Sequence, residues 1–178
     1  MQYYKKIEIP NLQGIIAKCL AYVKTQKEIY YQYPRGSFRH LNFKELVSHC
    51  PELMTAFSNY NIKPIHAVAI VVYRNRDMFV HIDHHDLDMQ ARINIPLQNC
   101  KNTYTEFYTG GEKEEYVNTL TGITASKIVK ATLVDRVEID QATVIRVTEP
   151  HTVRIDERFA PRVTLSISFD KDPIFLLD

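Results

Sequence analysis

The pattern of apolar and polar residues divides the chain near residue 62. Residues 11–32 place apolar side chains at the spacing of one helix face, with Asn11 as the expected N-cap. A second helical stretch, residues 42–60, is interrupted at Pro51. Because proline costs a helix interior about 3 kcal/mol but is tolerated in a first turn, we expect two short helices there. The first third of the chain is therefore predicted to be mostly helical.

From residue 63 onward, β-branched and aromatic runs alternate with polar turns. The runs with strand character are residues 65–73, 78–82, 91–97, 103–108, 127–134, 142–147, 151–155 and 162–169. Many short strands after a helical lead predict a mainly β (α+β) protein, an antiparallel sandwich or barrel braced by helices on one side. Residues 109–122, with paired glycines and an acidic run, are expected to form a long loop.

The composition fits one domain. A chain of 178 residues with 45% hydrophobic and 24% charged residues can bury one core and is too short for two ordinary domains. We expect a single domain over residues 1–178, with residues 1–62 as helical support and residues 63–170 as the β core. The net charge is +1 and no basic face is interleaved with aromatics, so a nucleic-acid partner is not expected.

The start of the sequence, its apolar stretches and its cysteines indicate where in the cell the protein is expected. No apolar leader opens the sequence, and the longest apolar stretch, residues 67–73, is too short to cross a bilayer. The three cysteines are widely separated and show no Cys-x-x-Cys spacing, which favours buried thiols over a disulfide framework. We expect a cytoplasmic protein with no membrane partner, and the oligomeric state stays open.

Two histidines and an aspartate form a candidate metal site. His81 and Asp83 follow an apolar run and, being two apart on a strand, project to one face; His151 comes from a later strand. Two imidazoles and one carboxylate suit non-haem Fe(II) and leave coordination positions open. A lone His-x-Asp is a frequent chance match, and His84 with Asp86 supplies a second one, so His84 is the reserve candidate.

The other histidines receive no ligand role from the sequence. His40, His49 and His66 fall in the helical part or at its exit, where surface or core positions are the ordinary interpretation.

A candidate carboxylate clamp follows the distal histidine. Arg162 and Thr164 share one strand face, and a guanidinium with a neighbouring hydroxyl can hold a carboxylate. If residues 151–155 and 162–169 form a hairpin, His151 and Arg162 lie opposite one another. The structural alternative is an ion pair from Arg162 to Asp156 or Glu157.

Together these residues resemble the signature of the Fe(II)- and 2-oxoglutarate-dependent oxygenases: His-x-Asp, a distal His, and Arg-x-Ser after it. Thr164 keeps the hydroxyl of that serine. Residues 91–97 resemble the Arg-x-His-x-Pro-Leu strand of the aspartyl/asparaginyl hydroxylase and proline hydroxylase-like branch, with Asn94 in place of the histidine. Arg92 and Asn94 share a face and are expected to contact co-substrate or substrate.

The resemblance implies a double-stranded β-helix (jelly roll, cupin-like) with N-terminal supporting helices. It implies Fe(II), 2-oxoglutarate and O2 as cofactor and co-substrates, with hydroxylation of an unactivated C–H bond and release of succinate and CO2. The substrate would be an amino acid, a peptidyl side chain or a small metabolite, met by residues 84–89 and 109–122. Two alternatives stay open: a non-catalytic jelly-roll binding or structural protein, and a cupin metalloenzyme that does not use 2-oxoglutarate.

Overall fold

The computed structural model describes residues 1–26, 37–75, 78–83, 89–117 and 124–178. Its helices and 3-10 turns are α1 (Leu12–Thr25), α3 (Phe43–His49), η1 (Pro51–Met54), η2 (Ser58–Tyr60), η4 (Glu157–Phe159) and η5 (Pro173–Leu176). Its strands are β1 (Tyr4–Lys6), β2 (Ser37–His40), β3 (Pro64–Val72), β4 (Ala91–Gln98), β5 (Tyr104–Thr109), β6 (Glu112–Val117), β7 (Thr124–Val129), β8 (Thr132–Val137), β9 (Thr143–Arg146), β10 (His151–Arg154) and β11 (Arg162–Phe169).

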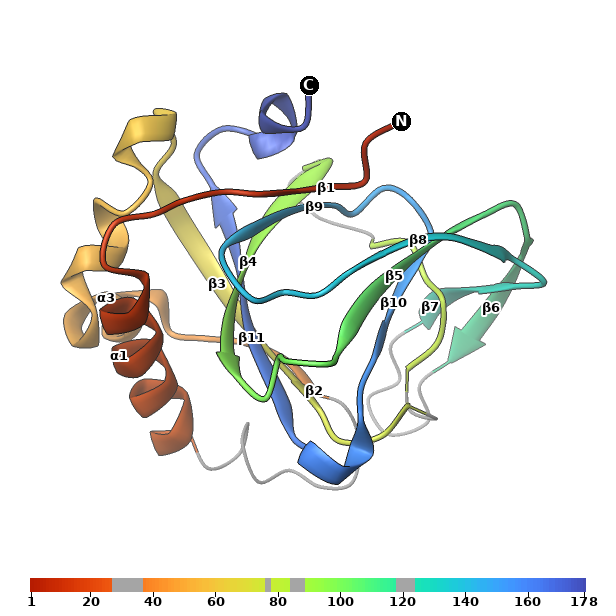
Figure 1. Ribbon diagram of the computed structural model, residues 1–178, viewed down its shortest axis with the longest axis horizontal. Helices are drawn as coiled ribbons and strands as arrows, with labels where there is room; N and C mark the ends of the chain where they lie inside the picture. Colours follow the sequence, from red (N-terminus) through yellow and green to blue (C-terminus); the bar gives the residue numbers. More distant parts are fainter. Residues whose placement is uncertain (27–36, 76–77, 84–88, 118–123) are drawn as a thin grey trace.

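Two antiparallel sheets form the body of the molecule. Within the described residues, the larger sheet has the strand order β1-β9-β4-β11-β3-β2, and the smaller has the order β10-β5-β8, beside the hairpin β6-β7. Figure 1 shows helices α1 and α3 on one side of the larger sheet and the smaller sheet on the other. The larger sheet is therefore the middle layer, with one face toward the helices and one toward the smaller sheet.

Strand β11 shows how the sequence divides these two faces. Its alternate residues Val163, Leu165, Ile167 and Phe169 are buried in the main core together with side chains of α1. The residues between them, Arg162, Thr164, Ser166 and Ser168, are buried on the opposite face. That face looks toward the smaller sheet, because Val72, which pairs with Arg162, packs against Val153 of β10. The predicted alternation of this strand is confirmed.

Other predictions of local structure have mixed outcomes. The helical stretch broken at Pro51 is confirmed, since α3 ends at His49 and η1 begins at the proline. Helix α1 starts after Asn11, but the Asn11 side chain makes no capping hydrogen bond. The predicted extension of this helix to residue 32 falls partly in residues 27–36, outside the described part of the chain.

The predicted hairpin of residues 151–155 and 162–169 is wrong. Strand β10 pairs with β5 in the smaller sheet, whereas β11 pairs with β3 and β4 in the larger one. The intervening residues, which include η4, carry the chain from one sheet to the other. His151 and Arg162 therefore reach the space between the sheets from different layers.

Two further strand predictions and one loop prediction need correction. Residues 78–82 do not form a regular strand; His81 makes only isolated bridges, to Lys127 and His151. Residues 127–134 divide between β7 and β8, since Lys130 adopts a positive φ of 57° that turns the chain. Residues 112–117, expected in a loop, form β6.

Tyr22 provides a test of the packing between α1 and α3. Its side chain is buried, and its hydroxyl donates to Glu45 of α3 at 3.2 Å. Burial, and then the neighbouring Glu45, raises the pKa of Tyr22 from 10.0 to about 12. A pKa raised by folding means that the contribution of Tyr22 to stability is present below pH 10 and is lost as the pH approaches 12.

We therefore expect the free energy of unfolding to fall more steeply between pH 10 and 12 in the native sequence than in Tyr22→Phe. The difference should amount to roughly 1–3 kcal/mol. Urea denaturation at several pH values measures it. Parallel pH profiles of the two proteins would contradict the assigned role of the tyrosine.

Candidate metal centre

The predicted ligands His81, Asp83 and His151 are brought together. The His81 N–H donates to the His151 carbonyl at 2.9 Å, and the His151 N–H donates back at 2.8 Å. This antiparallel bridge fixes the two backbones side by side, at the start of β10. One ligand atom from each of the three side chains lies within 4.8 Å of the others. The arrangement is compact enough for one ion to touch all three groups.

The two imidazole rings present the same nitrogen to the shared space. Nδ1 of His81 lies 2.9 Å from the Phe79 carbonyl oxygen, and Nδ1 of His151 lies 2.8 Å from that of Glu149. Because a carbonyl oxygen only accepts, each Nδ1 carries a hydrogen and donates it, so Nε2 is the atom of each ring that could bind a metal when it carries no proton. Both Nε2 atoms face Asp83 Oδ1, at 3.2 Å and 3.8 Å respectively.

The group attracts positive charge. Burial alone would lower the pKa of His81, but the hydrogen bond and the charge of Asp83 outweigh it and hold this pKa above its ordinary value. The side chains of Asp83 and His151 are only 18% and 9% exposed. A half-buried carboxylate between two imidazoles is suited to holding a cation. The reserve candidate His84, with Asp86, lies outside the described residues.

Arg162 is fully buried at the start of β11, on the face toward the smaller sheet. Its Nε donates to Thr103 Oγ1 at 3.1 Å, and burial lowers the pKa of its guanidinium. Among the residues that the structure describes, Arg162 Nη2 and Thr164 Oγ1 are buried without a hydrogen-bond partner. Buried polar atoms without partners are uncommon in native proteins and point to a group that is bound there.

The alternative ion pairs of Arg162 are not formed. Asp156 is held by Arg158, and Glu157 accepts a hydrogen bond from the backbone N–H of Asn75. Thr103, which does contact Arg162, was not identified from the sequence. It precedes β5 by one residue, and only the pairing of distant segments reveals its position.

The carboxylate clamp, Arg162 with Thr164, and the metal group, His81 with Asp83 and His151, lie at different positions along the strands. His151 pairs with Phe107 of β5, whereas Arg162 contacts Thr103, four residues earlier in the chain. The separation corresponds to roughly 13 Å along a strand. A ligand that touches both groups must therefore have two binding ends.

Arg92 lies near the start of β4, at the end of this strand away from Arg162, and Asn94 lies in the middle of the strand. Asn94 pairs with Ser166, on the face toward the smaller sheet, and Gln98 at the far end of β4 pairs with Val163 beside Arg162. Burial lowers the pKa of Arg92, and the charge of Asp83 opposes this effect, so Arg92 lies within the electrostatic reach of the metal group. Arg92 is thus near Asp83, whereas Asn94 lies between Arg92 and the clamp along β4.

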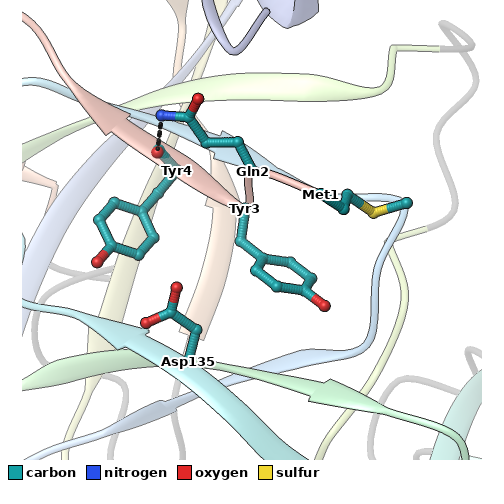
Figure 2. Close-up of a pocket in the computed structure, with 5 residues that line it drawn as sticks. All are labelled: Met1, Gln2, Tyr3, Tyr4 and Asp135. Carbon is teal, nitrogen blue, oxygen red and sulfur yellow. Dashed lines mark hydrogen bonds between the residues drawn. The ribbon is translucent and has the colours of Figure 1, made fainter.

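A shallow cleft of about 430 Å³ lies elsewhere, lined by Met1, Gln2, Tyr3, Tyr4 and Asp135 (Figure 2). The ring of Tyr3 stacks on Phe107 at 5.1 Å, and Phe107 lies 6.4 Å from the His151 ring. Phe107 is fully buried. This cleft contains none of the candidate ligands, and Phe107 forms a wall beside the metal group.

No protein-family model and no curated protein matches the sequence of this chain. In the described segments, no helix combines the length and apolarity needed to cross a bilayer.

Comparison with solved structures does find similar proteins. AviO1 from Streptomyces viridochromogenes Tue57 matches with a TM-score of 0.53 and 14% identity, covering 96% of this chain and 90% of its own. HygX from Streptomyces hygroscopicus, solved with nickel and 2-oxoglutarate bound, matches with a TM-score of 0.55 and 10% identity over 93% and 81% of the two chains. SnoN, a non-heme alpha ketoglutarate dependent epimerase from nogalamycin biosynthesis, matches with a TM-score of 0.52 and 12% identity. The match covers 96% of this chain and 78% of SnoN. Likeness at this level of identity establishes the fold, and the predicted jelly roll with supporting helices is confirmed.

Proposed function

We propose that this protein is an Fe(II)- and 2-oxoglutarate-dependent oxygenase that hydroxylates an unactivated C–H bond. The observation that carries the proposal is the convergence of His81, Asp83 and His151 within 4.8 Å, in one molecule with a buried arginine clamp. HygX, which has the same fold, binds nickel and 2-oxoglutarate, and this supports the choice of co-substrate. SnoN is an epimerase, and the mass of the product distinguishes the two reactions, because hydroxylation adds one oxygen atom to the substrate and epimerisation adds none.

The ligand set fits non-haem iron. Two neutral imidazoles and one carboxylate form the facial arrangement that Fe(II) oxygenases use, and they leave positions open for other ligands. The carbonyls of Phe79 and Glu149 hold the rings in the required tautomer. The chain thus supplies both the ligands and the contacts that orient them.

The clamp fits the distal carboxylate of 2-oxoglutarate. Arg162 Nη2 and Thr164 Oγ1 supply a charged donor and a hydroxyl that lack partners among the described residues. A five-carbon dicarboxylate has two acidic ends, one for the metal and one for the guanidinium. Thr103 Oγ1 accepts from Arg162 Nε and so positions the guanidinium.

When bound, iron with 2-oxoglutarate and O2 supplies the oxidation of R–H to R–OH, with release of succinate and CO2. The residues of this chain hold the reactants in place and limit access of water. The fully buried Phe107 lies beside the His151 ring and covers one side of the metal group. The substrate is an amino acid, a peptidyl side chain or a small metabolite.

Succinate release tests the proposal. The iron-loaded protein should convert 2-oxoglutarate to succinate slowly without a substrate, and faster when a screen of amino acids and peptides includes the right one. Asp83→Ala should release none. If the protein releases no succinate and nickel with 2-oxoglutarate does not raise its melting temperature, the proposal is wrong. Metal binding without binding of 2-oxoglutarate would instead support a cupin metalloenzyme of another kind.

A further inference from the structure

Four polar side chains form a row across the larger sheet, on the face toward the smaller sheet. The row consists of Arg92 on β4, Ser168 on β11, His66 on β3 and His40 on β2, and these four strands are consecutive neighbours. We name this set the basic row.

The pairing of the strands places each member beside the next. Ile93 pairs with Ile167, which sets Arg92 beside Ser168, and Ser168 pairs directly with His66. His66 Nε2 then lies 2.8 Å from His40 Nδ1. Arg92 shares its face with Asn94, which pairs with Ser166 on the inner face of β11.

The basic row runs from the interior to the edge of the sheet. Arg92 and Ser168 are buried, His66 is half-buried and His40 is exposed. Burial lowers the pKa of His66, and the charges of His40 and Arg92 lower it further, so the positive potential of Arg92 extends along the row. At the inner end of the row, burial lowers the pKa of Arg92 and the charge of Asp83 opposes this effect.

Ser168 adds a second observation. Its side chain is 1% exposed, and its Oγ has no hydrogen-bond partner within the described portion of the chain. A buried hydroxyl normally finds a partner, because leaving it unsatisfied costs about 1–3 kcal/mol. A bound polar atom at Ser168 would therefore complete the polar contacts of this hydroxyl.

The basic row is distinct from the clamp at Arg162. Ser168 lies six residues along β11 from Arg162, which corresponds to roughly 20 Å. One carboxylate cannot contact both. The row and the clamp are therefore two separate places on this face, and the sequence assigned no ligand role to His40 or His66.

We infer that the basic row binds an anionic group of the substrate, a carboxylate or a phosphate, and so sets which C–H bond lies beside the metal group. A guanidinium binds either anion through paired hydrogen bonds, and a hydroxyl and an imidazole N–H add donors. Arg92, at the inner end of the row, lies within the electrostatic reach of Asp83, so an anchored substrate is held near the metal ligands. The inference rests on the proposed function for its assignment to a substrate.

The test uses the imidazole proton signals of the metal-free full-length protein. Titration with inorganic phosphate, and separately with acetate, at constant pH should shift the signals of His66 and His40 in a saturable manner. The tighter of the two probes identifies the kind of anion. Arg92→Gln should weaken this binding about tenfold or more, since a charge-assisted bond is lost. Arg158→Gln, on the surface turn η4, should leave it unchanged.

Further variants separate a loss of anion binding from a failure to fold. Arg92→Lys keeps the charge and should retain part of the binding, and His66→Gln should weaken it even if Arg92→Gln does not fold. The basic row is not an anion site if neither probe shifts the two histidines, or if Arg92→Gln and His66→Gln bind as the native protein does. Anion binding in a protein that fails to bind 2-oxoglutarate would overturn the proposed function and the link to a substrate.

Discussion

Replacing His151 by alanine is expected to lower the affinity for nickel or iron more than about 100-fold. Loss of a residue that merely orients a ligand costs about 10–100-fold, and loss of a ligand should cost more. The variant leaves His81 and Asp83, which are two donors from one segment and cannot enclose an ion from two sides. Isothermal titration with nickel, in the presence of a competing chelator, measures the change.

The His151→Ala variant removes the imidazole without disturbing the backbone contacts of residue 151. The bridge between His81 and residue 151 uses only main-chain N–H and carbonyl groups, so it survives the loss of the imidazole. His49→Ala is the matched control, because His49 lies in the last turn of α3, outside the metal group. Equal nickel affinities for His151→Ala and His49→Ala would show that His151 is not a metal ligand and would contradict the three-residue metal site.

The parts of the site that depend on local pattern could be predicted from the sequence. His81 and Asp83 are two residues apart, and the alternation in β11 separates Arg162 and Thr164 from the apolar side chains between them. Such spacing determines which side chains share a face, whatever the rest of the fold does. The candidate ligands and the clamp were therefore within reach of sequence reasoning.

The pairing of distant strands was not predictable in this way. The turn residues 156–161 are equally compatible with a hairpin and with a crossing between sheets. The choice of a crossing is decided by contacts between the two sheets, such as Val72 against Val153. It is also decided by the pairing of β10 with β5 and of β11 with β3. These contacts leave no mark in the local sequence.

The basic row was missed for the same reason. His40 and His66 lie far in the sequence from His81, and their own surroundings resemble a helical lead and its exit. Only the order β4-β11-β3-β2 aligns them with Arg92 and Ser168. A search by motif finds residues at fixed spacing, whereas this set is defined by sheet order alone.

Arg162 is costly to the fold in the absence of a ligand. Its guanidinium is completely buried, and the hydrogen bond to Thr103 satisfies only part of it. Removing a cation from water costs several kcal/mol unless its partners compensate. Burial accordingly lowers the pKa of this arginine, which shows that the surroundings disfavour the charge. Functional residues often reduce stability in this way.

Arg162→Met should therefore separate stability from binding. We expect the free energy of unfolding of the ligand-free protein to stay equal or to rise by roughly 1–4 kcal/mol, because an apolar side chain of similar length replaces a buried charge. The further stabilisation that 2-oxoglutarate gives to the nickel-loaded protein, about 2.7 kcal/mol at a ligand concentration of one hundred times Kd, should disappear, whereas the stabilisation by nickel alone should remain. Urea denaturation with and without the ligands measures both effects, and Arg162→Lys, which keeps the charge but not the paired hydrogen bonds, should retain only part of the stabilisation. If Arg162→Met destabilises the ligand-free protein by several kcal/mol, the arginine is a structural support bonded to Thr103, and the carboxylate clamp must lie elsewhere.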